Sequence, residues 1–173
     1  MNLKDSVRSI KDFPKEGIIF RDVTTLFKNP EAFHQLMDEL AASLVDKNVD
    51  VVVGPEARGF AMGAPLAYLL HAGFVPVRKP GKLPAEVLSY SYDLEYGSDT
   101  IEIHKDAIRP GMKVAVVDDL LATGGTALAA CKLIEQLGGQ VVAVRFAIEL
   151  EGMGGRERLG EYDVRAAMGF EGD

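Results

Sequence analysis

The sequence predicts an α/β fold in which helices cover both faces of a mostly parallel, twisted sheet. Two observations lead to this prediction and to the expectation of a single domain. Short apolar runs rich in valine and isoleucine alternate along the chain with amphipathic stretches of helical period, and strands of that kind are buried on both faces. In addition, the 173 residues are 47% apolar and 26% charged, without a repeat, linker or low-complexity segment, so we expect one domain spanning residues 1–173.

From Pro30 onward, the sequence predicts a helix, a strand and a second helix. The stretch PEAFHQLMDELAASLV repeats apolar residues every three or four positions, which predicts an amphipathic helix with Asn29 as its cap and Pro30 at its first position. The run VDVVV, residues 49–53, is β-branched and ends at Gly54 and Pro55, so we expect a short strand there. Beyond the turn PEARG, the stretch FAMGAPLAYLLHAG is expected to form the second helix.

Three further strands and one helix continue this alternation. FVPVR and KVAVVDD are expected as strands, followed by the helix ALAACKLIEQLG and the strand VVAVRFAIEL. Residues 79–100 interrupt the pattern because they contain scattered Gly, Pro, Ser and Tyr, and they precede TIEIH, which alternates as an exposed strand would. We expect a long ordered loop here, and a loop of that length is more often a functional flap than a connector.

The net charge and the single cysteine narrow the class of protein. A formal net charge of -7 disfavours nucleic acid or an anionic membrane as the main partner, because both require a basic surface. Cys131 is the only cysteine and lies in an apolar, helix-like stretch, which favours a buried thiol in a reducing compartment. The first residues contain no apolar run long enough for a signal sequence or a membrane span, so we expect a cytoplasmic protein.

The stretch VVDDLLATGGT suits two kinds of ligand group at once. Residues 123–126 follow a predicted strand and open a predicted helix, so backbone amides, the helix dipole and two hydroxyls can surround a phosphate. Asp118 and Asp119 would repel that anion, but they can accept hydrogen bonds from sugar hydroxyls or hold a metal ion. A sugar phosphate satisfies both halves of the motif.

Other interpretations of these residues have less support. An apolar strand ending in two aspartates also occurs in P-loop nucleotidases, but neither G-x-x-x-x-G-K-[ST] nor G-x-G-x-x-G is present. The aspartates and glycines could alternatively form only a helix cap and a turn. That interpretation would be preferred for a lone Asp-Gly pair, but the stretch here is longer. His34, His71 and His104 do not follow a metal-ligand spacing, and no G-x-S-x-G nucleophile motif occurs.

Two further clusters suit a second anion. The turn GPEARG lies between a predicted strand and a predicted helix, so its amides and Arg58 can face an anion beside the first one. An isolated arginine is more often a surface ion-pair partner, and that alternative stays open from spacing alone. Arg78, Lys79 and Lys82 form a basic cluster at the start of the long segment, although such clusters are usually solvated.

Four segments together resemble the type I phosphoribosyltransferases, which use 5-phospho-α-D-ribosyl 1-diphosphate (PRPP). VAVVDDLLATGGT is similar to the ribose-phosphate-binding signature of that family, and the form DDLLATGGT is similar to its adenine-specific members. The other segments are DFPKEGIIFRD at residues 12–22, VVGPEARGF at residues 52–60, and VRKPGKLP with YDLEYG within residues 77–97. The resemblance covers nearly the whole chain, although the tail from Met153 is less distinctive.

The resemblance implies a role for each segment. Residues 1–30 would form a hood over the base, and residues 79–105 would form a flexible flap. The residues implied at PRPP are Ala122, Thr123, Gly124, Gly125 and Thr126 for the 5-phosphate, Asp118 and Asp119 for the ribose, and Glu56, Ala57, Arg58, Arg78, Lys79 and Lys82 for the diphosphate. The residues implied at adenine are Ile19, Phe20, Arg21 and Ile148, with Glu95 as the acid–base group and Tyr96 in the flap. Without the resemblance, GIIFRD could simply be a strand and Glu95 a solvated carboxylate.

The implied reaction is the transfer of a phosphoribosyl group from PRPP to adenine, which gives AMP and diphosphate. The resemblance also implies Mg²⁺, held mainly by substrate oxygens and water, and a homodimer in which Arg78 reaches the diphosphate bound by the neighbouring subunit. Two alternatives stay open. The chain could be a sibling enzyme for another base such as xanthine or guanine, or a PRPP-sensing regulator without the chemistry.

Overall fold

A central sheet of five parallel strands organises the computed structural model, which describes residues 1–94 and 96–172. The strand order is β4, β3, β7, β8 and β9. In that order the strands span Gly73–Val77, Val51–Pro55, Lys113–Leu121, Gln140–Glu151 and Val164–Glu171. Every neighbouring pair is parallel, so the carboxyl ends of the strands lie at one edge, where ligands of such sheets bind. The predicted α/β class is confirmed.

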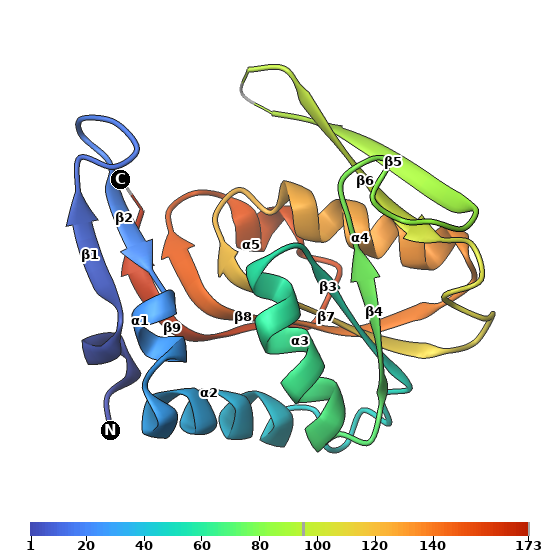
Figure 1. Ribbon diagram of the computed structural model, residues 1–173, viewed down its shortest axis with the longest axis horizontal. Helices are drawn as coiled ribbons and strands as arrows, with labels where there is room; N and C mark the ends of the chain where they lie inside the picture. The colour runs from blue at the N-terminus through green and yellow to red at the C-terminus, as the bar shows by residue number, and fades with distance from the viewer. Residues whose placement is uncertain (95, 173) are drawn as a thin grey trace.

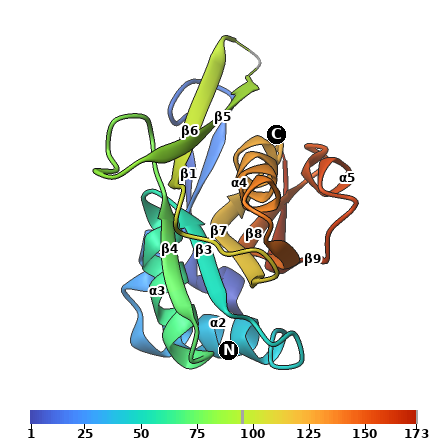
Figure 2. The same cartoon turned by 90° about the vertical axis from the view of Figure 1, so that its right-hand side faces the viewer.

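Helices cover both faces of this sheet. α2 (Pro30–Ala42) and α3 (Arg58–Leu69) pack on one face, and α4 (Gly125–Gln136) packs on the other, so that α3 and α4 lie on opposite sides of β3 and β7 in Figure 2. Along β7, Ala115 and Val117 enter the core beneath α2 and α3, whereas Val114 and Val116 enter the core beneath α4. The strand is apolar at successive positions because both of its faces are covered.

The start of α2 follows the expected capping pattern. The side-chain oxygen of Asn29 accepts hydrogen bonds from the backbone amides of Glu31 at 3.1 Å and Ala32 at 3.2 Å, and Pro30 opens the helix. These bonds satisfy amides that have no partner within the helix. Shorter helical turns are η1 (Leu3–Ser6), α1 (Thr24–Phe27) and α5 (Gly155–Arg158). In the described part of the chain, no helix is long and apolar enough to cross a membrane.

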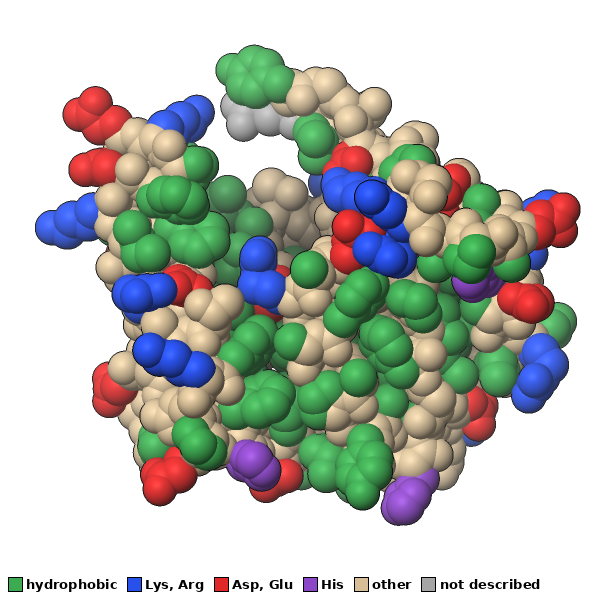
Figure 3. Space-filling model, in the orientation of Figure 1, with side chains coloured by type: hydrophobic (Ala, Val, Ile, Leu, Met, Phe, Trp, Pro, Cys, Tyr) green, Lys and Arg blue, Asp and Glu red, His purple; other side chains and the backbone are tan. Residues whose placement is uncertain are grey.

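Two antiparallel hairpins rise beyond the carboxyl edge of the sheet. The hood hairpin consists of β1 (Arg8–Lys11) and β2 (Ile19–Asp22), and the flap hairpin consists of β5 (Val87–Asp93) and β6 (Ser98–His104). They stand at opposite sides of the molecule in Figure 1. The space-filling view of Figure 3 shows the surface hollowed between them.

The flap hairpin differs from the expected long loop with an exposed strand behind it. β5 occupies part of that loop, and Ile101 and Ile103 of β6 are buried. Leu88, Tyr90 and Tyr92 of β5 also pack against the core on the α4 side. Every second residue of VLSYSYD is therefore apolar or aromatic and faces inward, which is the period of a strand with one covered face.

The fifth strand, β9, lies in the tail for which the sequence predicts no regular element. Its sequence VRAAMGFE contains one β-branched residue, and only Val164 and Met168 are buried along it. β9 forms the outer edge of the sheet beside β8. An edge strand needs less apolar patterning than a central one, so its signal in the sequence is weak.

Candidate functional site

The turn between β7 and α4 forms the floor of the site. Ala122, Thr123 and Gly124 connect the end of β7 to the amino end of a 12-residue helix. Gly124 has a φ of 84°, a left-handed conformation that favours glycine. Among the described residues, no side chain caps the first amides of α4. Those amides and the helix dipole are therefore available to an anion.

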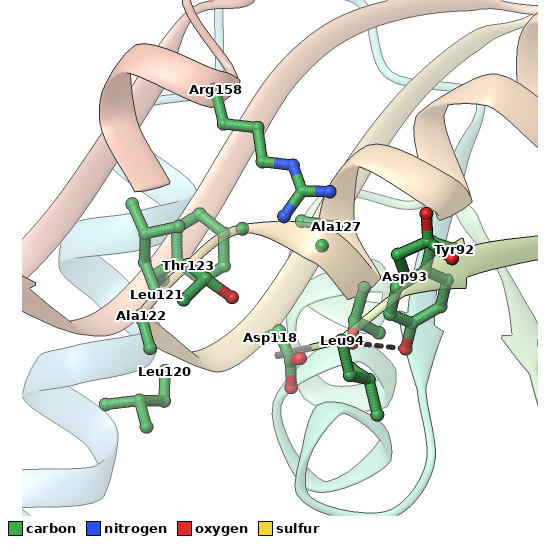
Figure 4. Close-up of a pocket in the computed structure, with 14 residues that line it drawn as sticks. Tyr92, Asp93, Leu94, Asp118, Leu120, Leu121, Ala122, Thr123, Ala127 and Arg158 are labelled. Carbon is green, nitrogen blue, oxygen red and sulfur yellow. Dashed lines mark hydrogen bonds between the residues drawn. The ribbon is translucent and has the colours of Figure 1, made fainter. Parts of the chain in front are cut away.

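A cavity of about 240 Å³ lies over this turn (Figure 4). All of the residues predicted at the 5-phosphate, residues 122–126, line it together with Asp118. Tyr92 of the flap hairpin and Arg158 of α5 line it as well. The fold thus brings the whole predicted phosphate loop and one predicted ribose carboxylate into one cavity.

A second cavity of about 130 Å³ adjoins the first. Its lining includes Glu56, Ala57, Arg58, Arg78, Lys79, Asp118 and Asp119. Tyr92, Thr126 and Asp118 line both cavities. Two places suited to anions therefore meet at Asp118, and three basic side chains surround the second of them.

Asp118 and Asp119 have different electrostatic environments. Asp119 accepts a hydrogen bond from Arg58 Nε at 2.5 Å, and this bond raises the pKa of the Arg58 guanidinium. Burial, and then the charge of Asp119, raise the pKa of the Asp118 carboxyl well above its usual range. The pair thus offers one carboxylate neutralised by arginine and one whose negative charge is poorly compensated, which can interact with hydroxyls or with positive charge.

The basic residues of the second cavity are held by carboxylates. Glu56 Oε1 accepts hydrogen bonds from the Lys79 amide at 2.8 Å and from Arg78 Nε at 3.2 Å, and these contacts, the Lys79 amide first, lower the pKa of Glu56. The Lys79 ammonium forms an ion pair with Asp99 of β6. Lys82, the remaining predicted member of the cluster, is exposed and lines neither cavity.

The residues predicted at the base lie outside these two cavities. Ile19, Phe20 and Arg21 belong to β2 of the hood hairpin, where the Phe20 ring packs edge-on against Phe13 with centroids 5.2 Å apart. The Arg21 guanidinium lies 4.6 Å from the centroid of the Phe170 ring. Ile148 of β8 is 1% exposed and belongs to the core beneath α2 and α3. Their contacts with a base stay predictions.

The flap residues fall into three groups. Glu95, the predicted acid–base residue, lies outside the described residues. Tyr96 is 85% exposed. Tyr92, which was not among the predicted site residues, lines both cavities, and its hydroxyl lies 2.8 Å from Thr126 Oγ1. Its inward direction follows from the alternation of VLSYSYD, a signal that the sequence contained.

Arg158 is the second residue that the motifs did not indicate. It lies in the short helix α5, within the tail that carries no distinctive motif. Its place at the cavity over the turn between β7 and α4 depends on how the chain folds back after β8. Spacing along the sequence contains no signal for such a contact.

The donor atoms of the site suit a magnesium ion that a substrate brings with it. Within the described ranges, no three His, Cys, Asp or Glu side chains form a group that could hold a metal by themselves. Mg²⁺ is commonly held by one or two carboxylates together with substrate phosphates and water. Asp118 lines both cavities and Asp119 lines the second, so two carboxylates lie close to where substrate oxygens would hold such an ion.

Comparison with known proteins places this geometry in context. The chain matches the family model of the phosphoribosyl transferase domain over residues 22–167. It is 58% identical over 171 residues to the adenine phosphoribosyltransferase of Alkaliphilus oremlandii, with 99% of each chain covered. It is likewise 58% identical over 170 residues to the adenine phosphoribosyltransferase of Alkaliphilus metalliredigens, with 98% of this chain and 100% of that one covered.

Solved structures show the same similarity in three dimensions. The adenine phosphoribosyltransferase of Thermoanaerobacter pseudethanolicus superposes with a TM-score of 0.94 at 54% identity, over 97% of this chain and 98% of that one. The enzyme of Saccharomyces cerevisiae superposes with a TM-score of 0.90 at 43% identity, over 95% of each chain. That structure was determined in complex with adenine and D-2,5-dideoxy-2,5-imino-altritol 1,6-bisphosphate.

Proposed function

The chain belongs to the phosphoribosyltransferase family, and on that premise we propose that it is an adenine phosphoribosyltransferase. It transfers the phosphoribosyl group of PRPP to adenine and forms AMP and diphosphate, a purine salvage reaction. Adenine as the acceptor is supported by relatives of that activity that are 58% and 54% identical over nearly the whole chain.

The observation that carries this function is the meeting at Asp118 of two cavities suited to anions. The 5-phosphate of PRPP would occupy the cavity over residues 122–126, and its diphosphate would occupy the cavity beside Arg58 and Arg78. The ribose then lies between them, where Asp118 and Asp119 can accept hydrogen bonds from its hydroxyls. A single ligand, with an anion at each end and hydroxyls in the middle, satisfies both cavities.

The geometry suggests how the reaction proceeds. N9 of adenine forms a bond to the anomeric carbon of the ribose while the bond from that carbon to the diphosphate oxygen breaks. Positive charge develops on the ribosyl group, and the nearby carboxylates stabilise it. Asp118 suits this role because Arg58 neutralises Asp119 through the 2.5 Å contact, whereas the charge of Asp118 is less compensated. Arg58, Arg78 and Lys79 stabilise the charge that the leaving diphosphate acquires.

One proton must leave the purine during this reaction. Glu95 belongs to the YDLEYG segment, and we assign it as the acceptor of that proton. The flap hairpin already contacts the phosphate loop through Tyr92. A flap closed over the site would exclude water, which competes with adenine for the ribosyl group.

We propose that the reaction requires Mg²⁺, whose charge would offset the negative charge of the diphosphate leaving group. Asp118 and Asp119 would orient the ribose hydroxyls, and the ligands of the ion would be mainly substrate oxygens and water. Within the described residues, no group of three His, Cys, Asp or Glu side chains could hold the ion without the substrate.

We further propose a cytoplasmic homodimer. The Arg78 side chain is 35% exposed at the rim of the second cavity, a position from which it could reach a diphosphate bound by a neighbouring subunit. Cys131 is a free, buried cysteine, and burial raises the pKa of its thiol to about 12. A core thiol of this kind is compatible with a reducing compartment.

The experiment that tests the proposed function uses the pure protein with PRPP and Mg²⁺, to which each purine or pyrimidine base is added separately while diphosphate release is followed. Release with adenine alone is the expected result. Release only with xanthine, guanine or another base would assign the chain to a sibling enzyme. Absence of release with every base, while PRPP still raises the melting temperature, would favour a PRPP sensor instead.

A further inference from the structure

The Arg158 side chain reaches the cavity over residues 122–126, here called the phosphate cavity, from outside those residues. Arg158 is the last residue of α5 and lines this cavity. Its Nη1 lies 3.4 Å from the position that a Cβ atom on Gly125 would take, and Gly125 is the first residue of α4. Figure 4 shows the guanidinium directed toward the turn between β7 and α4.

The charge balance of the cavity makes this cation important. The other charged side chains among its lining residues are Asp93 and Asp118, both acidic. Among the residues that the structure describes, Arg158 is therefore the only basic one that lines this cavity. A phosphate monoester carries a charge between about −1.5 and −2 at neutral pH, so the backbone amides of α4 alone would have to balance both the ligand and two nearby carboxylates.

Arg158 makes no ion pair with any described residue, unlike its neighbour on the same short helix. Arg156 binds the Glu149 carboxylate at 2.8 Å and also donates to the Val164 carbonyl at 2.9 Å. Arg156 is therefore engaged in holding α5 to β8 and β9. The donors of Arg158 remain free of carboxylates within the described part of the chain and can face a ligand.

The backbone that carries Arg158 is fixed against the phosphate loop. A Cβ atom on Gly155, at the start of α5, would lie 2.4 Å from the carbonyl oxygen of Ala122, so only glycine allows this close approach. On the other side of Arg158, Leu159 is fully buried. α5 is thus anchored at both ends, so ligand binding would need to order the arginine side chain but not the backbone that carries it.

We propose that Arg158 binds the 5-phosphate of PRPP and AMP directly, beside the amides at the start of α4. The inference rests on the proposed function for the identity of the ligand. A guanidinium can present two parallel N–H donors to phosphate oxygens. Arg158 would thereby complete a site that the phosphate loop forms only in part.

The test is calorimetric titration of the full-length protein with ribose 5-phosphate and, separately, with diphosphate in the presence of Mg²⁺. Arg158→Gln should weaken ribose 5-phosphate binding by roughly tenfold, the usual scale for a lost charge-assisted hydrogen bond. Binding of diphosphate should stay unchanged, and Arg158→Lys should recover part of the loss. Because Arg158 is exposed, the melting temperature of Arg158→Gln should match that of the wild type.

Lys132→Gln is the matched control. Lys132 lines a neighbouring surface cavity together with Arg158 but does not line the phosphate cavity. The substitution therefore removes one positive charge, as Arg158→Gln does, without removing the proposed contact. Unchanged ribose 5-phosphate affinity in Arg158→Gln, or an equal loss in Lys132→Gln, would overturn the proposal.

The binding measurement also separates this inference from the proposed function. Arg158-dependent binding of ribose 5-phosphate without AMP formation would support the inference and contradict the enzyme. If the wild-type protein forms AMP but its Arg158→Gln variant binds ribose 5-phosphate normally, the proposed function is supported and the inference about Arg158 is contradicted. A wild-type protein that neither forms AMP nor binds ribose 5-phosphate would overturn both.

Discussion

The Tyr92 hydroxyl lies 2.8 Å from Thr126 Oγ1, which joins the flap hairpin to the phosphate loop. The same hydroxyl makes a longer contact of 3.4 Å with Asp99, which in turn pairs with Lys79. A chain of polar contacts therefore runs from Lys79 in the second cavity to Thr126 on the floor of the first. Burial raises the pKa of Tyr92, so the phenol stays protonated and can serve as a donor at neutral pH.

Tyr92→Phe tests this connection. The substitution keeps the ring over Gly125 but removes the hydroxyl, and a single hydrogen bond contributes about 0.5–1.5 kcal/mol net. We expect the KM for PRPP to rise roughly 2- to 10-fold, since that energy corresponds to such a factor. Steady-state kinetics with saturating adenine measures the change. The control is Tyr68→Phe, because Tyr68 is 83% exposed on α3. The same KM change in both variants would contradict a role for the contact between Tyr92 and Thr126.

Asp118→Asn should stabilise the free protein and impair catalysis. Since the pKa of Asp118 is raised in the folded state, mainly by burial, the unfolded chain loses this proton first as pH rises, and stability falls from about pH 4 upward. Asparagine removes that cost, so the variant should melt higher than the wild type at pH 7 and equally at pH 3. Turnover should fall roughly 100-fold because a carboxylate that stabilises the ribosyl cation is lost.

The two halves of this prediction have separate readouts. Thermal melts from pH 3 to pH 8 give the stability difference, and initial rates of diphosphate release give turnover. A variant that melts lower than the wild type at pH 7 would contradict a raised pKa of Asp118 in the folded protein. Unchanged turnover would remove Asp118 from the reaction.

Asp22→Asn should have the opposite effect on stability. Hydrogen bonds from Thr24, and then from Arg8, lower the pKa of Asp22 to about 2, so its contribution to stability is present above about pH 4 and is lost as pH falls toward 2. We expect the variant to lose about 1–2 kcal/mol at pH 7, less than the full linkage value because Arg8 is largely exposed. Denaturant unfolding at pH 7 and pH 2 measures this, with Asp38→Asn of α2 as the control. A deficit that persists at pH 2 would refute the electrostatic origin.

Glu95→Gln tests the proposed proton acceptor. The amide keeps the size of the side chain but cannot take up a proton, so kcat should fall about 100-fold while the affinity for PRPP changes little. Rates and PRPP binding are measured on the same preparation. Glu86→Gln serves as the control because Glu86 lies just before β5 with an exposed side chain. Equal turnover in Glu95→Gln and the wild type would eliminate Glu95 as the acid–base residue.

The parts of the fold and of the site that can be predicted from the sequence are those determined by a few adjacent residues. The cap at Asn29, the β-branched strand that carries Asp118 and Asp119, and the glycine turn before α4 each follow from a few adjacent residues. A strand followed directly by a helix also fixes where its connecting turn lies, at the carboxyl edge of the sheet. The place of this turn at the carboxyl edge of the sheet could therefore be predicted from the sequence.

The remaining features depend on contacts between distant segments. Arg145 lies in the apolar run VVAVRFAIEL, yet it is fully buried and donates hydrogen bonds to Ser43 Oγ at 2.8 Å and to the Asp163 carbonyl at 2.7 Å. Arg158 and the edge strand β9 likewise acquire their roles only when the tail folds against β8. No periodicity or local motif encodes these partners, because they are set by tertiary packing.

The most direct test of the divided site is a crystal structure of the protein with ribose 5-phosphate, diphosphate and Mg²⁺. We expect the 5-phosphate at the amides of residues 123–126, the ribose hydroxyls at Asp118 and Asp119, and the diphosphate beside Arg58 and Arg78. A 5-phosphate bound in the cavity of Arg58, or a ribose whose hydroxyls make no contact with either aspartate, would contradict this division of the site.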